Sequence, residues 1–343
     1  MAEAAGVSVA TVDRVLNSRL PVRQSTALRV IEAAERLGYH GASLMRARLL
    51  ERSDAQIRTL GFLLLRRHEA FYQSFGRQLS AAASACGPGR CLAVVDYMDD
   101  LSPAAVAERL LDLGRDVDAI GVVATDHPHV SAAIDTLHAA GRPVFALLSD
   151  LSATRRAGYV GVDPRKSGRT AAWAIARLSK APGPVCVLVG SHRYLGHEAC
   201  EMSFRAYLRE RAPEFRVLDT QINLEEPQIA HEVTLDLLKR HPDLAGLYDA
   251  GGGGMAGTLR ALRAERPPGH PLGHIVTVSN ELTQEHRSAL ADDVIDVVLG
   301  TPQAPIARAV VHAMLEVLQR PQDERPLGVQ MTLPVEIYTA ENT

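Results

Sequence analysis

The spacing of apolar residues divides the chain into two parts. Near the N-terminus, Val12, Val15 and Leu16 recur at helical spacing and predict a short helix with one apolar stripe. From residue 59 onward, short continuous apolar runs alternate with amphipathic segments. Such runs predict strands of a parallel sheet buried on both faces, because helices must then cover both sides of it.

The predicted strands form two consecutive series. The first series comprises residues 60–65, 92–97, 119–123 and 144–148, with helices near 72–85 and 104–113. The second series comprises residues 184–189, 218–222, 245–248, 275–278 and 295–299, each followed by a helix or a turn. The predicted fold class is therefore α/β, with two doubly wound parallel-sheet lobes behind a small helical head.

The head begins with the features of a helix-turn-helix. Gly6 can take the left-handed conformation that ends one helix and opens a tight turn. Ser8 follows at the N-cap position of the next helix. Opposite the apolar stripe, this helix carries small and polar residues, namely Val9, Ala10, Asp13, Arg14 and Asn17. A short helix of this kind is what a helix-turn-helix lays in the DNA major groove.

This stretch resembles the DNA-binding head of the lac repressor (LacI/GalR) family. It fits the pattern Ala-x-x-Ala-Gly-Val-Ser-x-x-Thr-Val-x-Arg-Val-Leu-Asn, and residues 22–26, 29–34 and 37–39 fit the family's third helix and its exit. An αα-hairpin without a DNA role is disfavoured by the length of the match. Met1 already falls inside the family's first helix, so we expect either a misassigned start or a shortened first helix.

A helix-turn-helix predicts a role for each polar or small residue of this segment. We expect three side chains to bond phosphates and fix the register, namely Ser8, Thr11 and Asn17. Val9, Ala10 and Arg14 would face base edges, and Arg14 is the best candidate for a guanine contact. Partners are therefore double-stranded operator DNA and, as in the family, a second copy of the chain.

Residues 41–58 are predicted to form a hinge or linker, since they are rich in Arg and Leu and contain no Pro. The resemblance implies a hinge helix that orders on operator binding and wedges an apolar side chain into the minor groove. Leu49 is assigned this role, with Leu50 as the alternative. The Pro-Asn opening of the family's hinge is replaced by Gly41-Ala42, and a plain interdomain linker remains the alternative.

The predicted domains are a head at residues 1–40, this hinge at 41–58 and a two-lobed body at 59–343. The body resembles the type I periplasmic binding protein fold of the same family, with residues 158–163 and 168–172 typical of the crossing between lobes. Lobe 1 would comprise about 59–160 plus part of 302–330. Lobe 2 would comprise about 164–300 plus a last strand at 333–338.

Charge agrees with this division. The whole chain has a net charge of −3, but residues 1–58, the head together with the hinge, carry nine Arg and six acidic residues, so this part is +3 and the remainder is −6. A basic head on an acidic body fits phosphate binding by the head, with an affinity that falls as salt rises.

Cysteine usage and hydropathy predict a cytoplasmic protein. The four cysteines form no C-x-x-C pair and no zinc-like spacing with His, so we expect reduced thiols, no metal and no cofactor. No apolar run approaches 18 residues and no signal peptide is evident. No G-x-S-x-G or H-E-x-x-H motif is present, so an enzyme is not expected.

Ligand-binding candidates are sought where strands end, because open α/β sheets bind ligands beyond their carboxyl ends. In the first lobe these candidates are Phe71, Tyr72 and Asp150, with Asp163 at the crossover. The aromatic pair could stack on a sugar ring, as the family implies, although Phe71 could instead pack under its helix. Carboxylates accept hydrogen bonds from vicinal hydroxyls. Capping of the next helix is the alternative role of Asp163 and is the one favoured here.

In the second lobe the candidates are Arg193, Glu198, Asp249, Asn280 and Glu281. The resemblance implies an arginine that grips the ligand where this chain has Cys200, and a glutamine where it has Gly300. These departures predict a ligand other than a common hexose, or weak binding.

The sequence thus predicts a homodimeric transcription regulator, a repressor, controlled by a small polar ligand such as a carbohydrate bound between two lobes. A solute-binding protein of a transporter is one alternative, because the body alone would serve that role. A regulator without a small-molecule effector is the other.

Overall fold

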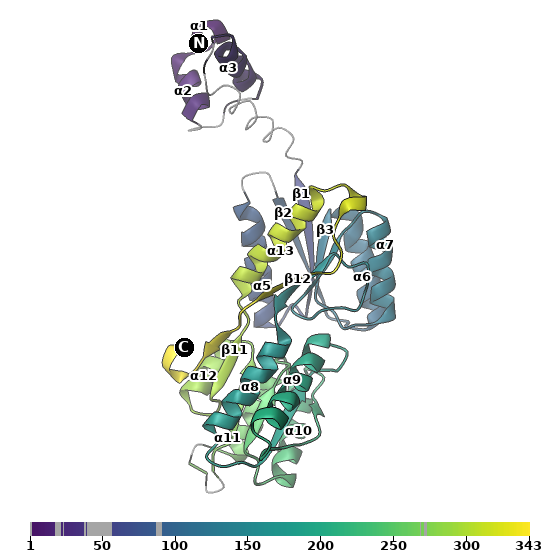
Figure 1. The fold of residues 1–343 in the computed structure, drawn as a ribbon, viewed down its shortest axis with the longest axis vertical. Helices are drawn as coiled ribbons and strands as arrows, with labels where there is room; N and C mark the ends of the chain where they lie inside the picture. The colour runs from purple at the N-terminus through teal and green to yellow at the C-terminus, as the bar shows by residue number, and fades with distance from the viewer. Residues whose placement is uncertain are drawn as a thin grey trace. The chain divides into compact units, whose positions relative to one another are not determined.

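The computed structural model describes residues 2–17, 22, 24–37, 39, 57–86, 91–267, 269–270 and 273–343. These residues belong to two compact units, Met1–Ile57 and Arg58–Thr343, which correspond to a head and a body (Figure 1). The predicted hinge lies outside the described residues except for its last two, Ile57 and Arg58, and so does Leu49.

The head is a small helical unit. Its helices are α1 (Ala2–Ala5), α2 (Val9–Asn17) and α3 (Gln24–Arg36). Gly6 connects α1 to α2 with φ +60°, a conformation that glycine adopts without steric cost. The Ser8 hydroxyl oxygen accepts a hydrogen bond from the Thr11 backbone N–H at 3.2 Å and so caps α2. The apolar core of this unit comprises Ala5, Val12, Val30 and Ala33.

The body consists of two lobes, each built on one sheet. The lobe 1 sheet has the order β12-β5-β4-β3-β1-β2 and is parallel throughout. Its strands are β1 (Arg58–Leu65), β2 (Cys91–Met98), β3 (Ala119–Val122), β4 (Val144–Leu147), β5 (Gly158–Val162) and β12 (Val329–Leu333). Strands β3 and β4 are buried along their whole length, as continuous apolar runs predict.

The lobe 2 sheet has the order β13-β11-β10-β9-β6-β7, with β8 also pairing with β6. Its strands are β6 (Pro184–Val189), β7 (Arg216–Val217), β8 (Gln221–Ile222), β9 (Gly246–Asp249), β10 (Val276–Asn280), β11 (Val297–Gly300) and β13 (Glu336–Tyr338). Strand β13 pairs antiparallel with β11, and the other pairs are parallel.

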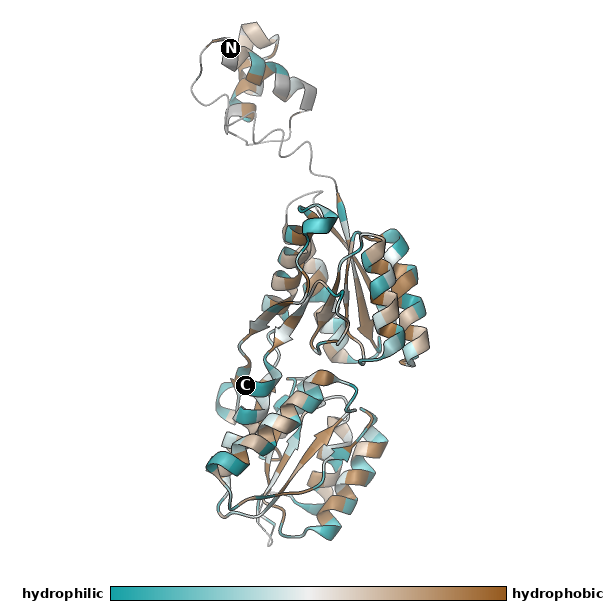
Figure 2. Ribbon diagram, turned by 45° about the vertical axis from the view of Figure 1, so that its right-hand side comes forward, coloured by the Kyte–Doolittle hydropathy of each residue, from teal (hydrophilic) through white to brown (hydrophobic). Residues whose placement is uncertain are grey.

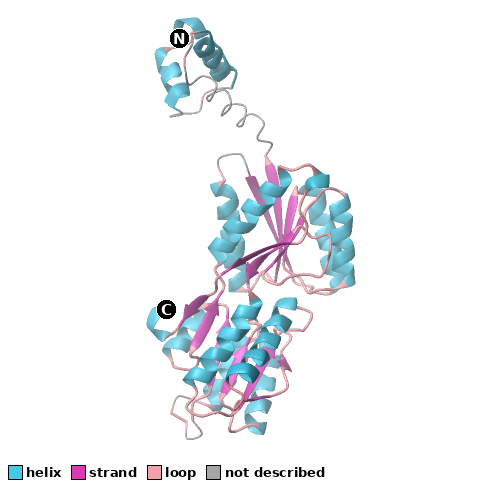
Figure 3. Ribbon diagram, viewed as in Figure 1, coloured by secondary structure: helices cyan, strands magenta, loops and turns pink. Residues whose placement is uncertain are grey.

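Helices cover both faces of each sheet (Figure 3). In lobe 1, α5 (Ala70–Ala85) packs with α13 (Gln303–Leu318), and α6 (Pro103–Asp116) packs with α7 (Pro128–Ala139). In lobe 2, α8 (Pro164–Leu178) packs with α9 (Leu195–Arg211), and α10 (Pro227–Arg240) packs with α11 (Met255–Glu265). Helix α12 (Gln284–Ala291) precedes β11, and the short 3-10 helices are η1 (Gln322–Glu324) and η2 (Ala340–Asn342).

The apolar cores lie between the sheets and these helices. The strands in the middle of each lobe are the most hydrophobic segments, while the outer faces of the helices are polar (Figure 2). The lobe 1 core includes Phe62, Phe75 and Phe145, all fully or almost fully buried. In lobe 2, Phe204 stacks on Tyr248 with ring centroids 5.5 Å apart.

The chain crosses between the lobes three times, after β5, β11 and β12. The first crossing enters α8, where Asp163 accepts hydrogen bonds from the backbone N–H groups of Arg165 and Lys166 and caps the helix. After β11 the chain passes back to lobe 1, where it forms α13. After β12 it passes to lobe 2 again, where it forms β13.

Two predicted strands differ from the structure. Of the expected strand at 218–222 only residues 221–222 form a strand, β8, and β7 precedes the expected range. The ladder to β6 is interrupted between them at Asp219, whose carbonyl oxygen accepts from the Gln221 side-chain amide and the Cys186 thiol instead. The expected last strand at 333–338 is divided between β12 and β13 at Pro334, which has no N–H to donate to a ladder. Residues 329–333 therefore add a strand to lobe 1 that the pattern did not predict.

Among the residues that the structure describes, no helix is long and apolar enough to span a membrane. Likewise, no group of three or more His, Cys, Asp or Glu side chains in this part of the chain is arranged to hold a metal ion.

Candidate functional site

Helix α2 presents an exposed face in the head. Its exposed residues are Val9, Ala10, Asp13 and Arg14. Val9 is 76% exposed, although an apolar side chain of this size is usually buried in a small unit. Arg14 makes no hydrogen bond or ion pair with any described residue, so its guanidinium is available for a partner. The opposite side of α2 buries Val12 in the core of the head.

The N-terminus of α2 adds two hydroxyl groups to this face. Ser8 Oγ lies 2.9 Å from Thr11 Oγ1, so the two hydroxyls form a pair at the N-terminus of α2. Helix N-termini and hydroxyl groups are common phosphate ligands in protein–DNA complexes. Asn17 is the last residue of α2, and its side chain lies outside the description. The DNA-contacting roles of these residues stay predictions.

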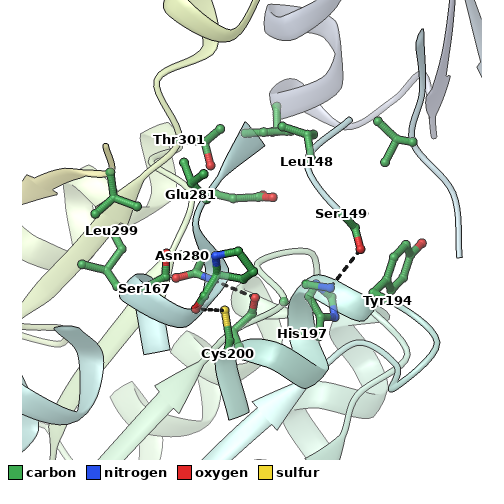
Figure 4. A pocket seen from close by; sticks show the side chains of 18 of the residues that line it. Leu148, Ser149, Ser167, Tyr194, His197, Cys200, Asn280, Glu281, Leu299 and Thr301 are labelled. Atoms are coloured by element: carbon green, nitrogen blue, oxygen red, sulfur yellow. Dashed lines mark hydrogen bonds between the residues drawn. The ribbon is translucent and has the colours of Figure 1, made fainter. Parts of the chain in front are cut away.

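The body contains a pocket between its lobes, with about 720 Å³ of empty space including the part open to solvent. Lobe 1 contributes Phe71 and Tyr72 from the first turn of α5, and Leu148 and Ser149 from the end of β4. Lobe 2 contributes residues of α8 and α9 and of the segments that follow β8, β9 and β10, and some of these side chains are labelled in Figure 4. The pocket thus lies at strand carboxyl ends, where open α/β sheets bind ligands.

Two carboxylates line the pocket, one from Glu225 after β8 and one from Glu281 after β10. Burial raises the pKa of Glu225 to about 8, and nearby Glu69 and Asp249 add to this rise while Arg66 opposes it. Burial also raises the pKa of Glu281 well above its usual range, with Glu225 as the next cause. The Glu281 side chain extends into the pocket (Figure 4), so its carboxyl group would face whatever occupies that space.

The other polar side chains of the pocket are mostly neutral groups. His197 lies with its Nε2 3.9 Å from Glu225 Oε1, but burial lowers its pKa to about 4 and keeps it uncharged at neutral pH. Asn280 donates from its amide to the Ala250 carbonyl at 2.8 Å and accepts from the Tyr248 hydroxyl at 3.1 Å. The Cys200 thiol donates to the Pro164 carbonyl, and burial raises its pKa to about 11.

Backbone strain is concentrated around this pocket. Leu148, Glu225 and Glu281 have φ values of 63°, 56° and 65°, in the left-handed region that non-glycine residues seldom adopt. All three line the pocket. Residues held in this region cost about 1–3 kcal/mol each and tend to occur at binding and switch sites.

Hydrogen bonds join the two lobes beside the pocket. Arg66 of lobe 1 pairs with Glu226 at 2.7 Å and donates to the Glu225 carbonyl at 3.0 Å. Ser149 Oγ accepts from the Gly196 backbone N–H at 3.1 Å, and Asp126 N–H donates to the Arg193 carbonyl at 2.8 Å. The lobes are therefore in contact around the pocket, and a change in their arrangement would break these bonds.

Four of the predicted ligand residues lie together in this pocket, namely Phe71, Tyr72, Asn280 and Glu281. The rings of Phe71 and Tyr72 meet edge to face with centroids 5.2 Å apart. The ligand-binding roles of these residues stay predictions, but the structure brings them to one place from opposite lobes.

Five predicted ligand residues do not line the pocket. Asp150 forms an ion pair with Arg156 and accepts from Gln330, and Asp163 caps α8. Asp249 is fully buried and accepts hydrogen bonds from the backbone N–H groups of Gly251 and Gly252. Arg193 and Glu198 are exposed, and Glu198 lines a different groove along α8 and α9.

Several lining residues were not among the predicted ligand residues: Ser149, Ser167, Tyr194, His197 and Glu225. Cys200, which stands where the resemblance implies a ligand-gripping arginine, also lines the pocket. Glu225 follows the end of a predicted strand, as the other candidates do, so the same rule could have selected it. Tyr194, His197 and Cys200 are spaced by three residues and share one face at the start of α9, which helical periodicity could have revealed.

Comparisons with known families agree with both parts of the chain. Residues 1–41 match the family described as bacterial regulatory proteins, lacI family, and residues 60–322 match the periplasmic binding protein domain. The chain belongs to the lacI family. The predicted family and fold class are thereby confirmed, and both matched families are regulatory or binding families rather than enzyme families. A comparison with curated proteins gives no match.

Solved structures similar to this lacI-family protein include several solute-binding proteins. A sugar-binding protein of a sugar ABC transporter from Bacillus halodurans has a TM-score of 0.71 at 18% identity, covering 83% of this chain and 98% of that chain. A solute-binding protein from Burkholderia graminis C4D1M, in complex with D-arabinose, has a TM-score of 0.73 at 16% identity, covering 84% and 97%. One from Agrobacterium vitis, bound to alpha-D-tagatopyranose, has a TM-score of 0.70 at 20% identity, covering 83% and 95%. These likenesses establish the fold of the body.

Proposed function

We propose that this protein is a transcriptional repressor whose affinity for operator DNA is set by a small polar effector bound between the lobes. The observation that carries the proposal is the presence in one chain of a lacI-family head with an exposed α2 face and a body with a pocket between two lobes. It would work in the cytosol, where its DNA is.

The pocket supplies a means of coupling the effector to DNA binding. A ligand that touches Tyr72 of lobe 1 and Glu281 of lobe 2 favours one arrangement of the lobes over others. Such a ligand can shift the equilibrium only by its difference in affinity between these arrangements. In a dimer, a shift in lobe arrangement changes the spacing of the two heads and therefore their fit to two half-sites.

Sugars are the first effector class to test. The similar solved structures include proteins bound to D-arabinose and to alpha-D-tagatopyranose, and hydroxyl-rich ligands suit a pocket with carboxylate, hydroxyl and amide groups. The lacI-family head favours a regulator over a transporter's solute-binding protein.

Arg14→Ala is expected to weaken binding to a cognate duplex by about 1–3 kcal/mol, because the guanidinium is unpaired on the exposed face of α2 and can bond a guanine in two places. The duplex would be selected from a random pool with the full chain, and affinities measured by fluorescence anisotropy at fixed salt. Binding to unrelated DNA should change much less.

Arg263→Ala is the matched control for that experiment, since Arg263 is a partly exposed arginine of α11 in the body. If Arg14→Ala reduced affinity equally for selected and unrelated DNA, the base-reading role would be refuted. If the full chain selected no sequence at all from the pool, the proposed regulatory function itself would fail.

Dimerisation is expected to involve the edge strand of lobe 1. Strand β2 exposes Leu92 (56% exposed) and Val94 (41% exposed) at an edge, and exposed apolar groups on an edge strand are suited to pairing with another chain. The double variant Leu92→Glu, Val94→Glu is expected to be monomeric in light scattering, while wild type is dimeric. Leu178→Glu, at another exposed apolar position, should remain dimeric. A monomeric wild type, or a dimeric double variant, would rule out this interface.

A further inference from the structure

The pocket between the lobes is acidic. Its described lining residues include two carboxyl groups, those of Glu225 and Glu281, and none of them is Lys or Arg. His197 is the nearest basic group on the lining, and it is held neutral by burial. An ionised carboxylate in such a place needs a cationic or hydrogen-bonding partner to offset its lost hydration.

The nearby cation, Arg66, is already engaged. Its guanidinium pairs with Glu226 at 2.7 Å and with Glu69 at 3.3 Å, and it donates to the Glu225 backbone carbonyl rather than to the Glu225 carboxylate. The Glu281 carboxylate makes no hydrogen bond or ion pair with any residue that the structure describes. It extends into the pocket instead (Figure 4). The protein therefore leaves acidic groups facing the ligand space without a cation of its own.

Aromatic rings line the same space. Phe71 and Tyr72 come from lobe 1, and Tyr194 comes from the start of α9 in lobe 2. The faces of such rings attract ammonium groups as well as packing against apolar atoms, and the attraction grows when water is excluded. Carboxylates and aromatic rings around one cavity are the groups that bind organic ammonium ions.

We propose that the effector is a hydroxylated amine, such as an amino sugar or amino alditol, whose protonated amino group lies between the carboxylates of Glu225 and Glu281 and whose hydroxyl groups meet the neutral polar side chains. This inference rests on the proposed function, because it specifies the ligand class of the same inter-lobe pocket.

Proton uptake and release would distinguish such a ligand from a neutral sugar. The pKa of Glu225 is raised to about 8, so its carboxyl is largely protonated near neutral pH, and burial raises the pKa of Glu281 as well. An ammonium group favours the ionised forms, so binding releases protons. The charged or titratable groups around these two carboxylates are Arg66, Glu69, Glu226, Asp249, His197, Tyr72 and Tyr194.

The test uses matched pairs of probes that differ by one amino group. The pairs are D-glucosamine with D-glucose, D-galactosamine with D-galactose, and D-glucamine with D-sorbitol. The full chain is titrated with each probe by calorimetry at pH 7 in two buffers of different ionisation enthalpy, and thermal shifts are recorded in parallel. At least one amine is expected to bind 10-fold or more tightly than its neutral partner, with proton release that the neutral partner does not show.

Variants of the two carboxylates make the assignment specific. Glu281→Gln and Glu225→Gln should each weaken amine binding by roughly 10- to 100-fold, as expected for loss of a charged hydrogen bond. Glu285→Gln should leave the affinity unchanged, because Glu285 is exposed on the first turn of α12 and does not line the pocket.

The outcomes separate this inference from the proposed function. If a neutral sugar binds as tightly as its amine or more tightly, the inference is overturned while the effector pocket stands. If an amine binds but neither carboxylate variant weakens it, the assigned positions are wrong and the inference is overturned as well. If no probe binds, the inference and the effector part of the proposed function both fail, and DNA binding is still judged by the Arg14→Ala experiment.

Discussion

Glu225→Gln is expected to raise the melting temperature of the body by about 5 °C or more near pH 8, a gain of about 2–4 kcal/mol. Folding raises the pKa of this carboxyl from its ordinary 4.5 to about 8, chiefly by burial. At neutral pH the unfolded chain carries the ionised side chain, and folding must take up a proton against this preference. Glutamine resembles the protonated carboxyl in shape and needs no proton.

The sign of the pH dependence follows from the same shift. A carboxyl with a raised folded-state pKa favours the folded state most below pH 4.5 and loses that contribution as pH rises toward 8. The stability difference between Glu225→Gln and wild type should therefore be small near pH 4.5 and increase up to about pH 8. Thermal unfolding followed by circular dichroism across this range measures it.

Glu285→Gln is the control for that experiment, since an exposed carboxylate has little influence on folding. An equal melting temperature for Glu225→Gln and wild type at pH 8 would show that Glu225 is not held in its protonated form. If Glu225→Gln is more stable than wild type but binds the effector more weakly, then the carboxyl group that serves binding lowers the stability of the fold, as strained and buried polar sites often do.

Gly168→Ala is expected to destabilise lobe 2 by about 3 kcal/mol or more. Gly168 lies on α8 where it crosses α9, and an added Cβ would overlap the Cys200 carbonyl oxygen and Ser203 Oγ. The Cys200 contact is with backbone, which cannot move aside without separating the helices. Overpacking of this kind usually costs about 1–3 kcal/mol, and more where backbone is displaced.

The same change should also alter the pocket, since Ser167 and Cys200 on either side of this crossing both line it. Thermal unfolding and effector titration of Gly168→Ala would record both effects. Gly196→Ala is the stability control, because a Cβ there would sit 3.4 Å from Ser149 Oγ in ordinary contact. A melting temperature of Gly168→Ala within 2 °C of wild type would mean that the helices can separate at little cost, contrary to this expectation.

The head illustrates what local sequence can predict. Gly6 and Ser8 act through their own backbone and near neighbours: Gly6 has φ +60°, and Ser8 caps the helix that follows. Val12 is buried and Val9 exposed, as helical periodicity requires. These features depend on residues within a few positions of each other, so their spacing along the chain reveals them.

The pocket was predicted only in part, because distant segments form it. Asn280 and Glu281 were found from their position after a strand, and they do line the pocket. The same rule selected Asp150 and Asp249, whose side chains turn instead to Arg156 and to the Gly251 and Gly252 backbone. A strand end gives the location of a residue but not the direction of its side chain.

The sequence by itself therefore determined the family, the helix-turn-helix and the alternation of buried strands and helices. These follow from motifs and periodicities that act over short stretches of chain. The tertiary structure alone decided which polar groups share the pocket and how each is charged. Glu225 and Glu281 are 56 positions apart in the sequence. Burial and the nearby Glu69 raise the pKa of Glu225, and burial and the nearby Glu225 raise that of Glu281; these surroundings exist only once the fold has formed.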